Sequence, residues 1–206
     1  VDLARFQPSV DQRSATRRAL EVDERAFVVL QVGDLIELKG QELLIEAARL
    51  GPKDILYLVA GGPRQQDPSS LAYASRLQQA AGENVRLLGP RDDVPLLLNA
   101  ADLLVVLSQQ ETGPSALLEA MASGKPVLST PVGLAPELVM PGITGEILDR
   151  REPELLAERI QELASHPEHV AAMGRQAREL AERELGLEAY QQRILQAIEA
   201  TLSQRP

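Results

Sequence analysis

Residues 26–60 read AFVVLQVGDLIELKGQELLIEAARLGPKDILYLVA, and this stretch decides the fold. Ala26–Val32 and Ile55–Ala60 are short apolar runs rich in β-branched residues, a composition typical of buried strands. Between them, Gln41–Leu50 repeats apolar residues at helical spacing. Two strands separated by one helix predict a right-handed β-α-β unit in which the strands lie parallel.

The same alternation continues to residue 150. Further strands are expected at Val85–Leu88, Leu103–Leu107, Pro126–Thr130 and Gly145–Leu148, and helices at Leu71–Ala80, Val94–Ala101 and Ser115–Ala122. Beyond Arg150 the pattern is helical only, at Glu152–Ala164, Pro167–Leu185 and Leu187–Leu202. The polar segment Pro63–Ser70 is expected to be a mobile loop. We therefore predict a Rossmann-like α/β fold, a doubly wound parallel sheet of about six strands with a C-terminal helical tail. Residues 1–206 would form one domain, divided into a β/α core (1–150) and the tail (151–206).

Composition and charge exclude several classes of protein. The net charge of −9 argues against a broad nucleic-acid-binding surface. The absence of cysteine excludes disulfides, zinc–thiolate sites and thiol nucleophiles, and fits a cytoplasmic protein. No apolar run reaches the ~18–20 residues that span a bilayer, although membrane association of a longer parent protein stays open. The first residues, Val1-Asp2, begin without Met, as expected of a fragment of something longer.

The loop after the fourth predicted strand holds the main candidate site. From Ser108 to Val127 the chain reads SQQETGPSALLEAMASGKPV. Gly113 suits a helix N-cap, and Pro114 suits the first helical position. The unpaired amides of Ser115 and Ala116, at the positive end of the helix dipole, would then form an anion site.

Two carboxylates flank this predicted helix start, Glu111 before it and Glu119 inside it. Carboxylates accept hydrogen bonds from the hydroxyls of a sugar or a ribose, whereas helix amides bind phosphate. Together they describe a nucleotide-sugar site. Spacing alone does not separate this interpretation from two solvated glutamates on a helix surface.

The neighbouring residues resolve that ambiguity. The segment resembles the E-x7-E signature of the retaining glycosyltransferases of family 4, also called glycosyl transferases group 1, which have a GT-B fold. The residues that match are Glu111–Val127 without a gap, Val132-Gly133, Pro136-Glu137, Pro141–Gly145, Ala101-Asp102, Ser108 and, at the start, Val1-Asp2, Phe6 and Pro8. The resemblance therefore covers nearly the whole chain in the expected order.

This resemblance implies roles for individual residues. The chain would be the second of two Rossmann-like domains, and the first, which binds the acceptor, would precede Val1. Glu119 would bind the ribose hydroxyls, and Glu111 would contact the donor sugar and stabilise its oxocarbenium-like transition state. Amides of residues 113–116 would hold the diphosphate, and Lys39 would neutralise it as it leaves. The resemblance implies a nucleoside-diphosphate sugar as substrate, with no metal and no other cofactor.

The loop after the first predicted strand departs from the family in one position. Residues Gly33–Gly40 resemble the family's Gly-Arg-Leu…Lys-Gly phrase, which makes Gly33 and Lys39 donor-binding candidates, although Lys39 alone reads equally well as a surface charge. Asp34 stands where relatives commonly have a second cation. A like charge ~4 Å from a phosphate costs roughly 4 kcal/mol at an effective dielectric of 20. We therefore expect Asp34 to point away, or a cation such as Arg91 to compensate for it.

Three further residues are donor-site candidates by their place in the family pattern. Leu88 and Arg91 follow the third predicted strand, where relatives hold the nucleotide base. Gly133 suits a close approach of the backbone to the donor, or a turn. Gly61 and Gly62 are instead expected to allow tight backbone geometry.

These observations leave three functions to compare. The leading one is a glycosyltransferase donor domain that takes part in retaining hexosyl transfer, with UDP-sugar as one possible donor class, and that is inactive as an isolated fragment. The second is a non-catalytic nucleotide-sugar-binding module in which Asp34 weakens the diphosphate clamp. The third is a sugar-nucleotide epimerase or a phosphorylase of similar fold.

Overall fold

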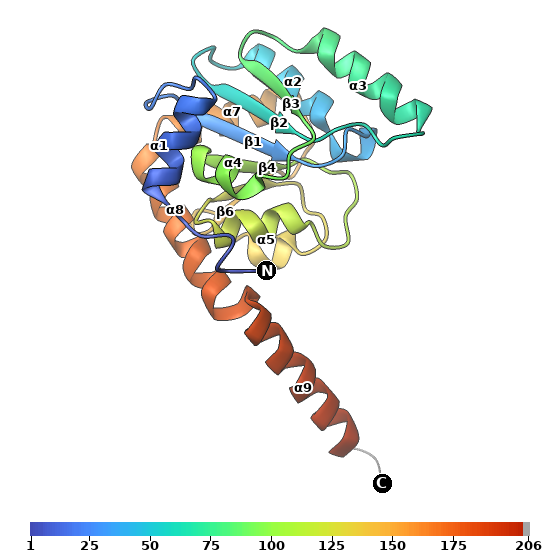
Figure 1. Ribbon diagram of the computed structural model, residues 1–206, viewed down its shortest axis with the longest axis vertical. Coiled ribbons are helices and arrows are strands. Elements are labelled where there is room, and N and C mark those ends of the chain that lie inside the picture. Colours follow the sequence, from blue (N-terminus) through green and yellow to red (C-terminus); the bar gives the residue numbers. More distant parts are fainter. Residues whose placement is uncertain (204–206) are drawn as a thin grey trace.

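The computed structural model describes residues 1–203, and it has a Rossmann-like α/β fold built on one parallel sheet (Figure 1). The strands are β1 (Val28–Val32), β2 (Leu56–Ala60), β3 (Val85–Gly89), β4 (Leu103–Val106), β5 (Val127–Ser129) and β6 (Gly145–Ile147). Their order in the sheet is β3-β2-β1-β4-β5-β6, and every neighbouring pair is parallel. The chain therefore reverses its direction of winding between β1 and β4, where ligands bind in sheets of this kind.

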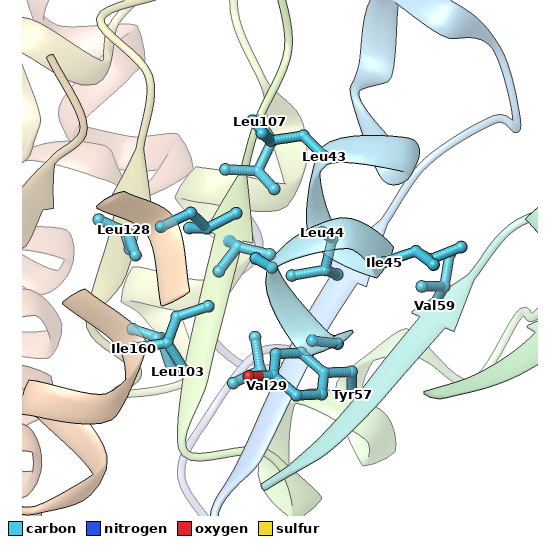
Figure 2. Packing of buried hydrophobic residues seen from close by; sticks show 14 of the residues in the cluster. Val29, Leu43, Leu44, Ile45, Tyr57, Val59, Leu103, Leu107, Leu128 and Ile160 are labelled. Atoms are coloured by element: carbon cyan, nitrogen blue, oxygen red, sulfur yellow. The ribbon is translucent and has the colours of Figure 1, made fainter. Parts of the chain in front are cut away.

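The four central strands, β2, β1, β4 and β5, are buried on both faces, as their largely apolar sequences predict, whereas the edge strands β3 and β6 are partly exposed. In β1, Val29 packs into one hydrophobic cluster, whereas its neighbours Val28 and Leu30 pack into the other. Figure 2 shows the first cluster, where Leu44 lies against the strand residues Val29 and Tyr57. Both of these cores are mainly aliphatic, with Tyr57 and Tyr73 in the first and Phe6 in the second.

Helices cover each face of the sheet. The first cluster takes its helical residues mainly from α2 (Gln41–Leu50), α3 (Pro68–Ala80) and α7 (Pro153–Ala164). The second takes them mainly from α4 (Val94–Ala100) and α5 (Ser115–Ala122), and α8 (Pro167–Leu180) contributes to both. The remaining elements are α1 (Val10–Ala19), the 3-10 turn η1 (Glu37–Lys39), α6 (Ala135–Leu138), the π-helical turn η2 (Ala181–Leu185) and α9 (Leu187–Ser203).

The sequence predicts all six strands and the larger helices, with ends that shift by one or two residues in most of them. Two predictions need correction. The segment Pro63–Ser70 is not wholly a loop, because Asp67 caps a helix that begins at Pro68. The segment Pro167–Leu185 is not one regular helix, because its last turn is π-helical. The last residues of the predicted tail, 204–206, lie outside the described residues.

Helix α1 has no counterpart among the predictions, because it is held by charged groups and carries no apolar stripe. The guanidinium of Arg17 is fully buried and donates to the Ala100 carbonyl (2.9 Å) and to Asp102 (2.8 Å). Arg13 binds the other oxygen of the same carboxylate at 2.7 Å. Asp102 also accepts from the backbone amide of Val28 at 2.8 Å, so one carboxylate ties α1 to the start of β1.

Helix α9 continues away from the rest of the molecule (Figure 1). It leaves several large apolar side chains exposed, namely Leu187, Tyr190, Ile194, Leu195 and Ile198. Across residues 1–203, no helix has both the length and the apolar character that crossing a membrane requires.

Candidate functional site

A small cavity of about 110 Å³ lies at the carboxyl ends of β1 and β4, at the point where the winding reverses. It is lined by Gln31, Val32, Gly33, Lys39, Val105, Val106, Leu107, Ser108, Glu111, Pro114, Ser115, Ala116 and Glu119. The structure thus brings together seven of the predicted site residues from two separate loops and one helix. These are Gly33, Lys39, Glu111, Pro114, Ser115, Ala116 and Glu119.

Lys39 reaches this cavity because the turn at Gly40 packs against the end of β4. Gly40 has φ +71°, and a Cβ there would overlap the carbonyl oxygen of Leu107, so only glycine lets the turn lie directly against the end of β4. The side-chain amide of Gln31 donates to the Lys39 carbonyl at 2.7 Å. The backbone amide of Gln109 donates to the Leu38 carbonyl at 2.8 Å. These bonds fix the backbone on both sides of the lysine.

The Lys39 ammonium forms an ion pair with Glu111 inside the cavity. Both side chains are largely shielded, with 27% of Lys39 and 15% of Glu111 exposed. The hydroxyl of Ser108 donates to the same carboxylate oxygen at 3.0 Å. Cation and carboxylate therefore neutralise each other here, and a phosphate would compete with Glu111 for Lys39.

Helix α5 has the predicted bounds, Ser115–Ala122, but its N-cap and its first helical position each lie one residue later than predicted. Pro114 is the N-cap and Ser115 the first helical residue, because Pro114 keeps an extended backbone with ψ 103°. Within the described residues, the amides of Ser115 and Ala116 have no hydrogen-bond acceptor, and both residues line the cavity. Two unpaired amides at a helix start match what the predicted anion site requires, and anion binding there stays a prediction.

Glu119 lies one turn further along α5 and faces the same cavity. Burial raises the pKa of its carboxyl, and the positive charges of Arg5 and the amino terminus offset part of that rise. An acceptor held in this partly desolvated place binds hydroxyl groups well, because it gives up less water when a ligand arrives.

Four predicted residues lie outside the cavity lining. A Cβ on Gly133 would lie 2.9 Å from the Thr112 carbonyl, so Gly133 packs closely against the loop that precedes α5. Gly113 precedes the helix and has open space around it. Leu88 packs on the second hydrophobic cluster. Arg91 binds Asp93 through two nitrogens, at 2.7 and 2.5 Å.

Asp34 has a cationic partner, but not the one expected. Its carboxylate accepts from Nε of Arg64 at 2.9 Å, whereas Arg91 is held by Asp93. The expectation that a cation compensates for Asp34 is therefore confirmed, but the cation is Arg64 and not Arg91. The expectation of tight geometry at Gly61 is confirmed, because its φ is +154° and a Cβ there would overlap the Gly33 carbonyl.

Two residues of the site region went unnoticed in the sequence. Gln31 is 3% exposed, and its side-chain oxygen is buried with no hydrogen-bond partner among the described residues. A polar residue in an otherwise apolar central strand is the signal that could have identified it. Arg64 could not have been identified, because its pairing with Asp34 depends on how two loops meet.

A larger hollow of about 530 Å³ lies elsewhere, at the amino-terminal ends of β2 and β3. Its lining includes Arg49, Lys53 and Asn84, and all three donate to backbone carbonyls. Since these polar groups already have partners and no helix begins there, its size does not make it the better candidate.

A profile of the family described as "Glycosyl transferases group 1" matches residues 12–180. The chain belongs to this family. It is similar to D-inositol 3-phosphate glycosyltransferase from Mycolicibacterium gilvum, with 36% identity over 170 residues that cover 79% of this chain and 37% of the relative. The corresponding protein of Corynebacterium efficiens is 31% identical over 87% of this chain and 45% of its own length. The chain thus spans less than half of these relatives.

Solved glycosyltransferase structures share the fold. HepE from Anabaena, crystallised in complex with UDP, superposes with a TM-score of 0.90 at 27% identity, over 97% of this chain and 56% of HepE. The C-terminal domain of a glycosyl transferase group 1 protein from Francisella tularensis superposes with a TM-score of 0.75 at 20% identity, over 91% of this chain and 99% of that domain. The six-stranded parallel sheet is therefore that of the GT-B glycosyltransferases.

Proposed function

We propose that this chain is the donor-binding domain of a retaining glycosyltransferase of family 4, and that it binds a nucleoside-diphosphate sugar at the start of α5. The observation that carries the proposal is the convergence of two unpaired helix amides, Lys39, Glu111 and Glu119 on one cavity at the switch point of the sheet. HepE, which shares this fold at 27–28% identity, was crystallised with UDP and with UDP-glucose, so a UDP-sugar is the first donor to test.

Each group has a role that suits its chemistry. The amides of Ser115 and Ala116 bind the diphosphate, and Lys39 neutralises it. Glu119 accepts from the ribose hydroxyls. The cavity of about 110 Å³ is smaller than a ligand-sized pocket of roughly 300–1,000 Å³. The donor must therefore lie across the opening of the cavity, or enlarge it by breaking the ion pair between Lys39 and Glu111.

That separation would link binding to chemistry. Once phosphate replaces Glu111 on Lys39, the Glu111 carboxylate can accept from hydroxyls of the sugar while Ser108 keeps it in place. As the bond from the anomeric carbon to the diphosphate breaks, its electron pair leaves with the phosphate, where the amides and Lys39 stabilise the charge. Attack of the acceptor on the same face would retain the anomeric configuration.

The acceptor is expected to bind elsewhere in a longer protein. This chain spans 37% of the Mycolicibacterium relative and 56% of HepE, so a large part of each relative has no counterpart here. We therefore expect the 206-residue chain to bind donor but to transfer little sugar. The relatives' acceptor, D-inositol 3-phosphate by their names, is a candidate for the longer protein.

Calorimetric titration with UDP, GDP and ADP, and then with their glucose conjugates, tests the proposal. Glu119→Ala should weaken every nucleotide alike, because the ribose is common to all of them. Glu111→Ala should lose the added affinity of the sugar, and it should not weaken the nucleotides themselves, because it frees Lys39 for the phosphate. Glu158→Ala, an exposed glutamate on α7, serves as the control and should change neither. The proposal fails if no nucleotide binds at millimolar concentration, or if Glu119→Ala binds like the control.

A further inference from the structure

The charges that line the cavity leave the diphosphate undercompensated. Lys39 is paired with Glu111, and Glu119 adds a second carboxylate. A nucleoside diphosphate brings at least two negative charges of its own to this place. One shared lysine and two helix amides do not balance them, so a further cation near the carboxyl ends of β1 and β2 would strengthen binding.

Arg64 is the candidate for this cation, and it lines a neighbouring hollow together with Glu37 and Asp67, outside the cavity itself. It follows β2, whereas Asp34 follows β1, and these strands are adjacent, with Val32 opposite Ala60. Backbone bonds join the two loops, from Gly33 to the Ala60 carbonyl (3.0 Å) and from Leu35 to the Gly62 carbonyl (2.9 Å). The loop that carries Arg64 thus meets the loop that carries Lys39 directly.

A buried serine fixes this arrangement. The hydroxyl of Ser70, which is 1% exposed, accepts from the backbone amide of Arg64 at 2.8 Å and donates to the Leu35 carbonyl at 2.7 Å. The Arg64 side chain then donates through Nε to Asp34. Among the described residues its two terminal nitrogens have no partner, so its two strongest donors stay available to an anion.

The other arginines near this edge are less suitable. Arg91 uses two nitrogens on Asp93. Arg151 lies against the Gly40 turn, and its Nε is buried inside the protein. Arg76 pairs with Glu37 at 2.5 Å through a terminal nitrogen.

We infer that Arg64, positioned by Asp34, is a second cation for the donor's diphosphate, an assignment that rests on the proposed function. Asp34 then acts as a positioning residue, and its negative charge is cancelled by the arginine that it holds. The acidic residue where relatives carry a cation is accordingly compatible with donor binding.

Titrations of the 206-residue chain with UDP and with uridine test this assignment. Arg64→Gln should weaken UDP about tenfold, or about 1.4 kcal/mol, and leave uridine unchanged, because only UDP carries phosphate. Arg76→Gln is the matched control, since it removes another exposed arginine paired with an acidic residue of the Lys39 loop, and both affinities should stay within about twofold.

A double-mutant cycle tests the role of Asp34. In the Arg64→Gln background the Asp34 carboxylate has lost its cation and repels phosphate, so adding Asp34→Asn should restore part of the UDP affinity. In the wild-type background Asp34→Asn should give no gain, because the arginine loses its anchor.

Two results would overturn the assignment alone: Arg64→Gln binding UDP like Arg76→Gln, or Asp34→Asn tightening UDP equally in both backgrounds. If the wild-type chain binds none of UDP, GDP and ADP, the donor site itself is wrong and the assignment fails with it.

Discussion

Glu119, the residue that we propose binds the ribose, lowers the stability of the fold because its carboxyl is partly buried. Burial raises the pKa of its carboxyl above the ordinary value of 4.5, so the folded chain holds this proton more tightly than the unfolded chain does. As pH rises through the window between those two pKa values, the group therefore makes the fold less stable, and the loss is complete once the pH exceeds the raised pKa. Such a cost is typical of a residue that is retained for binding.

Glu119→Gln should remove this loss, because the amide cannot ionise. We expect the variant to match the wild type below about pH 4.5 and to be the more stable of the two at pH 7, while UDP binding weakens. Urea unfolding across pH 3.5–7 measures the difference. Glu158→Gln, on an exposed position, should show no pH-dependent difference. A stability difference for Glu119→Gln that does not change with pH would contradict this account of the carboxyl.

Gly61 is required because the backbone of the neighbouring loop leaves no room for a side chain at this position. Gly61→Ala would add a methyl group onto the Gly33 carbonyl at φ +154°, so we expect it to destabilise the fold by at least about 1–3 kcal/mol. Gly113→Ala, where no atom lies within 4 Å of the added group, is the control and should change stability little. Urea unfolding distinguishes the two, and equal effects would refute the close contact between the loops.

At the scale of elements, helix α1 depends on one buried guanidinium. Arg17 makes five hydrogen bonds, to the carbonyls of Ala100, Asp23, Glu24 and Ala26 and to Asp102. Arg17→Met should therefore cost about 3–5 kcal/mol, because it leaves Asp102 without its buried partner. The exposed neighbour Arg18→Met should stay within about 0.5 kcal/mol. Chemical unfolding measures both, and a small loss for Arg17→Met would mean that Arg13 alone can hold the helix.

The same element shows what the sequence could and could not predict. The central strands were predictable because they are largely apolar runs buried on both faces. Helix α1 was not, since its attachment is made by Arg13, Arg17 and Asp102 through contacts between residues far apart in the chain. The convergence of Lys39, Glu111 and Glu119 was predictable because parallel strands end at one edge. The pairing of Asp34 with Arg64 was not, because loop conformation decides it.

Across the whole molecule, the order of the strands places the candidate site. The sheet reverses its winding between β1 and β4, and the cavity with its unpaired amides lies there, whereas the larger hollow lies at the opposite ends of β2 and β3. The central claim is that a nucleoside diphosphate binds at the first of these places through helix α5.

Amide chemical-shift mapping of the 206-residue chain during titration with UDP tests that claim most directly. The account predicts the largest shifts at Gly113, Ser115 and Ala116 and in the loop from Gly33 to Gly40, with smaller shifts around Arg64. Shifts that cluster instead around Arg49 and Asn84, or no shifts at millimolar UDP, GDP and ADP, would contradict it.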